Sequence, residues 1–113
     1  MNYRFVLDES FEREVKRLSK RYRSLKSDLK NLLEELKANP QLGVSLGGGV
    51  RKIRMAIASK GRGKSGGARV ITFTVVAAVD ETEVNLLYIY DKAERESIGK
   101  DEIETLLRDN GLM

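Results

Sequence analysis

Residues 58–65 read ASKGRGKS, a stretch whose residue types could bind phosphate. The string fits the looser form of the Walker A pattern, in which Ala58 and four further residues precede the Gly-Lys-Ser triplet at 63–65. In a phosphate-binding loop of this class, a strand leads into the glycine-rich turn and a helix follows it, so that the helix N-terminus binds the phosphates. Here two more glycines come next, and the run after them is rich in Val, Ile, Thr and Phe, which indicates a strand. We therefore expect the loop to connect two adjacent strands and to bind no nucleoside triphosphate.

A concentration of positive charge surrounds this loop. Between residues 51 and 69 there are seven basic residues and no acidic one: Arg51, Lys52, Arg54, Lys60, Arg62, Lys64 and Arg69. From Asp80 onward the balance reverses, with ten acidic residues against four basic ones. Such segregation favours contact between one part of the surface and a polyanion. A second basic cluster, within residues 16–23, is better explained as a solvated helix face.

The chain contains no Cys and no His, which limits the chemistry it can perform. Disulfides, thiolate nucleophiles and thiolate or imidazole metal ligands are excluded, as is the commonest general base at neutral pH. Any reaction must use Lys, Arg, Tyr, Ser or carboxylate side chains. We expect neither a metal ion nor a cofactor.

Length and composition predict one domain spanning residues 1–113. Hydrophobic residues make up 41% of the chain and charged residues 34%, which suits a modest core beneath a heavily charged surface. No apolar run approaches the roughly 20 residues that cross a bilayer, and the N-terminus lacks the apolar core of a signal peptide. We expect a cytoplasmic protein with no membrane partner.

Apolar spacing predicts two consecutive amphipathic helices after a short strand at 3–7. In the first, capped by Asp8 or Ser10, apolar residues fall three or four positions apart: Phe11, Val15, Leu18 and Tyr22. Ser24 begins the second helix, and Asn39 ends it before a proline. Its apolar face consists of Leu25, Leu29, Leu32, Leu33 and Leu36. The short link between the two helices predicts a helical hairpin.

Three strands and a final helix are expected in the rest of the chain, after a turn-rich loop at 41–49. Residues 50–57 alternate, so that Lys52 and Arg54 share one face of a strand and apolar side chains share the other. Residues 68–79 and 83–90 form the next two strands, joined by a turn at 80–82, and the tail 97–111 fits a short helix. The predicted class is therefore α+β.

The loop and its neighbours resemble the signature of the RelE/ParE superfamily of bacterial toxins, in particular its HigB-like branch. Three segments carry the resemblance: RKIRM at 51–55, GKSGGARVI at 63–71 and IYDKAERE at 89–96. Their order and spacing make the match fairly specific, and it covers nearly the whole chain. It implies a RelE-like fold, in which an N-terminal helical hairpin packs on a curved, mainly antiparallel β-sheet that is followed by a short C-terminal helix.

Toxins of the RelE and HigB kinds are ribosome-dependent endoribonucleases that cut mRNA, and a cognate antitoxin silences each one. Carried over by position, the resemblance implies five catalytic residues: Lys52, Arg54, Lys64, Arg69 and Lys92. Ala93 stands where RelE-type sequences carry a further arginine. The tyrosine that some members use from the C-terminal segment has no match at 97–99, and Tyr90 is the candidate substitute.

These residues suit RNA cleavage by the 2′-hydroxyl of the RNA itself, which must lose a proton as negative charge builds on the phosphate. Positive neighbours disfavour the charged form of a lysine, so Lys52 is the candidate base. Arg54 and Arg69 would hold the phosphate, and Lys64 or Lys92 would protonate the leaving oxygen. Further RNA contacts are expected from Arg51, Lys60, Arg62 and Tyr90.

The five catalytic candidates are expected to converge on one patch of the sheet, where substitution lowers activity and not stability. The competing interpretations are structural: Lys52 and Arg54 as ordinary exposed strand residues, and Arg69 as an ion-pair partner of a C-terminal acid. Two other functions compete with RNA cleavage, a ParE-like gyrase poison and a non-catalytic RNA-binding module. The expected partners are the ribosome, mRNA and a cognate antitoxin, HigA-like and bearing a helix-turn-helix domain.

Overall fold

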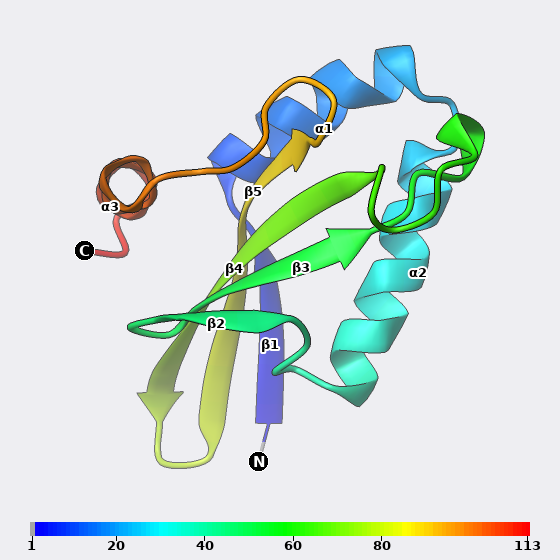
Figure 1. Cartoon of the computed structure of the whole chain (residues 1–113). Helices are drawn as coiled ribbons and strands as arrows, with labels where there is room; N and C mark the ends of the chain where they lie inside the picture. Colours follow the sequence, from blue (N-terminus) through cyan, green and yellow to red (C-terminus); the bar gives the residue numbers. More distant parts are fainter. Residues whose placement is uncertain (1) are drawn as a thin grey trace.

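The computed structural model describes residues 2–113, which form five strands, three α-helices and one 3₁₀ turn (Figure 1). In chain order the elements are β1 (Asn2–Leu7), α1 (Glu9–Arg21), α2 (Leu25–Ala38), β2 (Val44–Gly47), β3 (Val50–Met55), η1 (Ala58–Lys60), β4 (Ala68–Ala78), β5 (Glu81–Asp91) and α3 (Lys100–Asp109).

The strands form one sheet in the order β1-β5-β4-β3-β2. β1 pairs with β5 in parallel, and the other neighbours are antiparallel. The helices α1 and α2 cover one face of the sheet, and α3 packs on the other face (Figure 1). The α+β fold expected from the sequence is therefore confirmed: two N-terminal helices, a mostly antiparallel sheet and a short C-terminal helix.

The main core lies between the sheet and the helical hairpin. Strand residues alternate between the two faces, apart from a bulge at Leu87 in β5, so the side chains of one face meet the apolar stripes of α1 and α2. The helices contribute the buried residues Phe11, Leu18, Leu25, Leu29, Leu32 and Leu36, and the sheet contributes Ile53, Met55, Ala68, Val70, Leu86 and Ile89. The stripes predicted from the sequence thus face the sheet as expected.

A smaller core lies on the second face, beneath α3. Ile103 and Leu107 of α3 pack against apolar residues of three strands, namely Val50, Ile71, Leu87 and Tyr90. This cover does not extend over the whole face, because Arg54 on β3 remains exposed. The open part of the second face holds most of the residues considered below.

Three details differ from the sequence-based expectation. Residues 44–47, expected in a loop, form the edge strand β2, whose four residues are all exposed and so lack the alternation that marks a half-buried strand. The turn between β4 and β5 consists of residues 79–80 rather than 80–82. Asp8 and Ser24 occupy the N-cap positions of α1 and α2, but neither side chain bonds to a helix amide.

Within residues 2–113, no helix has the length and apolar character required to span a membrane.

Candidate functional site

Three cations lie together on the open face of the sheet. Lys52 and Arg54 occupy alternate positions of β3, and Arg54 pairs in register with Arg69 of β4. Residues in register on antiparallel strands have their side chains on the same face, with Cα atoms about 4.5–5.5 Å apart. The two arginines are therefore direct neighbours, and Lys52 lies two residues along the same strand.

Among residues 2–113, these cations have no acidic partner in an ion pair. None of the ion pairs formed within residues 2–113 involves Lys52, Arg54, Lys64 or Arg69. Like charges placed opposite one another on a sheet are destabilising. The arrangement therefore presents unneutralised positive charge that an anion would stabilise.

Arg69 is buried, with 7% of its surface exposed, and it organises the glycine-rich loop. Its Nη1 donates hydrogen bonds to the carbonyl oxygens of Lys64 at 3.0 Å and Ala68 at 3.1 Å, and its Nη2 donates to that of Ser65 at 3.2 Å. The structural alternative proposed for Arg69, an ion pair with a C-terminal acid, is wrong, because its partners are carbonyls of the loop itself. An arginine has five N–H donors. Three are used in these hydrogen bonds within residues 2–113.

The loop at residues 58–67 places Lys64 next to this arginine. Gly61 and Gly63 have φ angles of 68° and 66°, the left-handed conformation that glycine adopts without strain. Gly67 closes the loop against β3, where a Cβ atom would lie 2.1 Å from the carbonyl oxygen of Met55. Lys64 is exposed, and so is Arg62, whose side chain lies over Gly66. No helix follows the loop, since β4 begins at Ala68.

Lys92 lies in the turn after β5, beside the end of the loop. Its amide donates a 3.0 Å hydrogen bond to the carbonyl oxygen of Gly67. Its Nζ donates a 2.8 Å hydrogen bond to the carbonyl oxygen of Glu96, so the side chain is partly engaged within the turn.

Arg51 does not join the cations of the open face. It precedes Lys52 on β3 and by alternation lies on the side that faces the helical hairpin. Its guanidinium donates hydrogen bonds to the carbonyl oxygens of Leu42 at 3.3 Å and Gly43 at 2.8 Å, which ties the α2–β2 loop to β3. These hydrogen bonds give Arg51 a structural role, and its expected contact with RNA stays a prediction.

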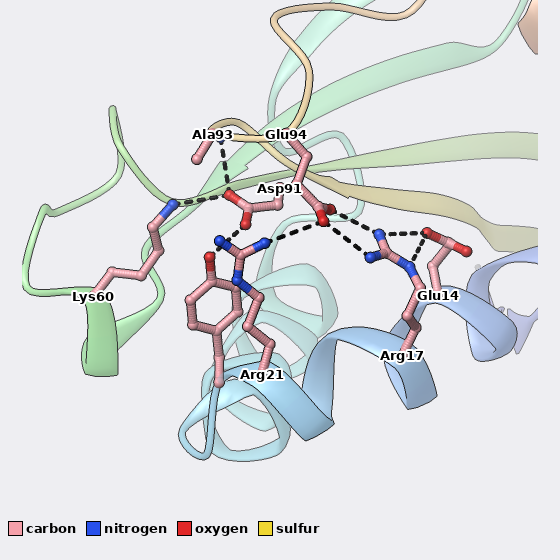
Figure 2. A network of polar contacts seen from close by, with 8 residues as sticks. Glu14, Arg17, Arg21, Lys60, Asp91, Ala93 and Glu94 are labelled. Atoms are coloured by element: carbon pink, nitrogen blue, oxygen red, sulfur yellow. Dashed lines mark hydrogen bonds and ion pairs between the residues drawn. The ribbon is translucent and has the colours of Figure 1, made fainter.

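Lys60 is also committed within the protein. Its Nζ lies 2.8 Å from Oδ1 of Asp91, with 10% of the Lys60 side chain and none of the Asp91 side chain exposed (Figure 2). The ammonium group further lies 5.4 Å from the ring centroid of Tyr22. A lysine held in this way is not presented to RNA, so it does not act as the surface contact expected from the sequence.

Tyr90 is in register with Arg69 on the open-face side of β5, but only 2% of it is exposed. The guanidinium of Arg95 lies 5.4 Å from its ring centroid, and Arg95 is held there by a bidentate ion pair with Glu102 of α3. Burial raises the pKa of the Tyr90 hydroxyl, despite the nearby positive charge of Arg69 and Arg95. Tyr90 is thus covered by the linker to α3 and cannot stack on a base in this arrangement.

Two residues near the site, Tyr88 and Asp91, are not among the candidates expected from the sequence. Tyr88 is in register with Ile71, which is in register with Lys52, so this half-buried ring lies in the row that contains the candidate base. Alternation from Tyr90 could have identified it. Asp91 binds Lys60, and no sequence pattern marks that pair, because its members are 31 positions apart.

A family model described as the RelE toxin of the RelE/RelB toxin-antitoxin system matches residues 9–110. The match runs from the first residue of α1 to the residue after α3 and therefore includes all the candidate site residues. Toxins of this family are ribonucleases that act with a cognate antitoxin. The chain belongs to the RelE toxin family.

Proposed function

We propose that this toxin is a ribosome-dependent endoribonuclease of the HigB-like branch, which cuts translated mRNA without a metal ion. One observation carries the proposal: Arg54 and Arg69 lie opposite each other on one open face, with Lys52 beside them and no carboxylate paired to any of the three among residues 2–113. A scissile phosphate is an anion that such a group would bind.

The reaction suited to these residues is an internal transesterification. The 2′-hydroxyl oxygen attacks the adjacent phosphorus, a new P–O2′ bond forms, and the bond from phosphorus to the 5′ oxygen breaks. Lys52 takes the proton of the 2′-hydroxyl as the general base. The products are one RNA end with a 2′,3′-cyclic phosphate and another with a 5′-hydroxyl.

Each of the other cations has a role that follows from its position. The exposed Arg54 and the guanidinium of Arg69 bind the phosphate oxygens and stabilise their charge in the transition state. Lys64 donates the proton to the leaving 5′ oxygen, because its side chain is exposed on the loop that Arg69 holds. Lys92 contributes positive charge from the neighbouring turn, with Nζ already bonded to Glu96.

Dependence on the ribosome follows from what the site lacks. Among residues 2–113, Tyr90 is buried and Tyr88 is only half-exposed, and the chain has no histidine, so proton transfer depends on lysines and base stacking on a partly covered ring. Binding mRNA in the decoding site would supply the missing orientation, which is worth several orders of magnitude in rate.

The antitoxin partner is proposed to be HigA-like, with a helix-turn-helix domain. Support comes from the RKIRM and GKSGGARVI segments, whose resemblance is to the HigB-like branch. Affinity purification from the native host should recover the product of a neighbouring gene.

The test of the proposed function is cleavage of mRNA on programmed ribosomes. We expect rapid cleavage that leaves 5′-hydroxyl and 2′,3′-cyclic phosphate ends, the products of attack by the 2′-hydroxyl, and little cleavage of the same RNA without ribosomes. Fragments with 5′-phosphate ends would contradict the proposed chemistry. Growth inhibition with intact mRNA and inhibited gyrase would instead favour the ParE-like alternative.

A further inference from the structure

Asp91, the last residue of β5, is fully buried between two segments that carry candidate site residues. Its Oδ1 accepts hydrogen bonds from Nζ of Lys60 at 2.8 Å and from the amide of Ala93 at 2.9 Å, and its Oδ2 accepts one from the hydroxyl of Tyr22 at 2.5 Å. Burial disfavours the charged form of Asp91, but these hydrogen bonds and the charge of Lys60 outweigh it, so the pKa of Asp91 is lowered. A buried, ionised carboxylate therefore joins three parts of the chain.

The first segment is the start of the glycine-rich loop. η1 ends at Lys60, so the ion pair with Asp91 holds the loop at this point. On the other side of η1, the amide of Ala58 donates to Oδ2 of Asp28 at 3.1 Å and the amide of Ser59 donates to Oγ of Ser24 at 2.9 Å. The end of the loop is held separately by Arg69, as described above. Lys64 thus lies on a loop that is fixed at both ends.

The second segment is the turn after β5, which carries Lys92. Asp91 bonds to the amide of Ala93, and Glu94 forms ion pairs with Arg17 at 2.7 Å and Arg21 at 3.2 Å on α1 (Figure 2). The pKa of Glu94 is lowered chiefly by its hydrogen bonds to Arg17. The turn is therefore fastened to α1 on one side and to the glycine-rich loop, through Asp91, on the other.

We propose that Asp91 and Lys60 are positioning residues for RNA cleavage, which hold the loop of Lys64 and the turn of Lys92 at a fixed separation beside Arg54 and Arg69. The inference rests on the proposed function. Neither Asp91 nor Lys60 touches RNA, since the carboxylate is buried and its lysine partner is 10% exposed. A buried ion pair is a weak source of net stability compared with apolar packing, but it demands one geometry, and here that geometry sets the position of two cationic segments.

The experiment compares Lys60→Met and Tyr22→Phe with a control, Lys37→Met. Lys37 also forms an ion pair, with Glu34, but both side chains are more than half exposed on α2. Two quantities are measured for each protein: single-turnover cleavage of mRNA over a range of ribosome concentrations, and hydrogen–deuterium exchange of backbone amides. Tyr22→Phe removes one hydrogen bond to Asp91 with little change in shape, so it provides the test if Lys60→Met does not fold.

For Lys60→Met we expect the maximal cleavage rate to fall about 10- to 100-fold, because misplacement by an ångström costs that much. The ribosome concentration at half-maximal rate should not change. Amide exchange should accelerate within residues 58–67 and 92–96 and not in the core strands. Tyr22→Phe should show the same pattern more weakly, Lys60→Arg should recover part of the rate, and Lys37→Met should match the parent.

Unchanged exchange in both segments, for Lys60→Met and Tyr22→Phe alike, would overturn the positioning role whether or not the protein cuts RNA. An unchanged maximal rate, or a loss confined to ribosome affinity, would overturn it as well. If the parent protein cuts no mRNA on ribosomes, the proposed function fails, and the exchange data still decide whether Asp91 anchors the two segments.

Discussion

Arg54 lies directly opposite Arg69 on the antiparallel strands β3 and β4, and the two guanidinium groups share one face of the sheet. Arg54 is exposed, whereas Arg69 is buried and bonded to the carbonyl oxygens of the glycine-rich loop. Substitution of Arg54 and substitution of Arg69 should therefore affect the stability of the protein differently, although the two residues lie in the same row of the sheet. The first two predictions depend on this difference.

Arg54→Ala should remove activity and keep the fold. An exposed cation opposite another cation is a source of repulsion, so we expect the free energy of unfolding to stay constant or rise by about 0.5 kcal/mol. The cleavage rate on ribosomes should fall about 10²- to 10³-fold, the usual loss when one group that stabilises a developing oxyanion is removed. Thermal denaturation and the ribosome assay measure the two effects. Arg13→Ala, on the exposed side of α1, is the control, and full activity of Arg54→Ala would remove this residue from the site.

Arg69→Ala should lose activity and stability together. If Arg69 were an exposed cation among other cations, its substitution would cost no stability, but the side chain is buried and makes three hydrogen bonds to backbone carbonyls. Their loss should lower the free energy of unfolding by about 1–3 kcal/mol. Urea denaturation measures this change. A variant as stable as the parent would show that the loop does not depend on Arg69.

Gly67→Ala should be strongly destabilising, because its methyl group would lie 2.1 Å from the carbonyl oxygen of Met55. Strand β3 or the loop must shift to relieve the contact, at a cost of about 2 kcal/mol or more. Gly99→Ala is the matched control: no heavy atom outside its chain neighbours lies within 4 Å of the added carbon. It should lower stability by about 0.5–1 kcal/mol, the loss expected when alanine replaces glycine at a helix N-cap, and so by less than Gly67→Ala. Equal melting temperatures for the two variants would contradict this account.

Asp8→Asn should stabilise the protein at neutral pH and not in acid. Burial, and then the charge of Glu83, raise the pKa of Asp8 from 3.8 to about 6, and its Oδ2 is buried without a hydrogen-bond partner. Because the folded protein favours the protonated form, this group contributes stability below pH 3.8 that is lost as the pH rises through about 6. Asparagine does not ionise and is an equally good N-cap residue.

The difference in free energy of unfolding between Asp8→Asn and the parent should therefore be about 3 kcal/mol at pH 7.5 and about 0.5 kcal/mol at pH 4. Glu12→Gln, at an exposed position of the same helix, serves as the control and should show little of this pH dependence. A constant difference across the range would mean that ionisation of Asp8 is not its cause.

Nucleotide binding is the remaining prediction. The loop at 58–67 leads into β4, so no helix N-terminus is directed at a bound phosphate. Calorimetric titration with ATP or GTP and magnesium should show no saturable binding in the micromolar range. Such binding would require a phosphate site that the pattern of glycines does not by itself create.

Local patterns in the sequence predicted the parts of the fold that depend on local chemistry. The leucines of α2 recur at helical spacing, and alternation in β3 separates Lys52 and Arg54 from Ile53 and Met55; both arrangements are present in the structure. The same alternation also places Arg51 on the opposite face from Lys52. Counting the basic residues between 51 and 69 does not separate the two faces, so Arg51 was grouped with the RNA contacts. β2 was missed because an exposed edge strand needs no buried face.

The polar contacts of the site depend on tertiary structure and were not predictable in the same way. Lys60 pairs with Asp91 because the folded chain places η1 beside the end of β5. In the sequence, nothing distinguishes Lys60 from the exposed basic residues near it. Tyr90 is buried because Arg95 and α3 cover it, an outcome set by residues that follow it in the chain. The partners of Arg69 are backbone carbonyls, which every residue has, so the sequence does not show which of them the arginine will bind.

The parallel pairing of β1 with β5 has a consequence for how the toxin is made. β1 pairs with β5, which spans residues 81–91, and α1 packs on that same strand. The sheet and the main core therefore cannot be completed until β5 has been synthesised. Contacts between residues far apart in sequence form slowly and only after the intervening chain exists. A polypeptide whose synthesis stops before Glu81 has neither the strand beside Arg69 nor the carboxylate of Asp91. We therefore expect interrupted translation of this gene to yield fragments that lack the folded site, so that activity begins only when the chain is nearly finished.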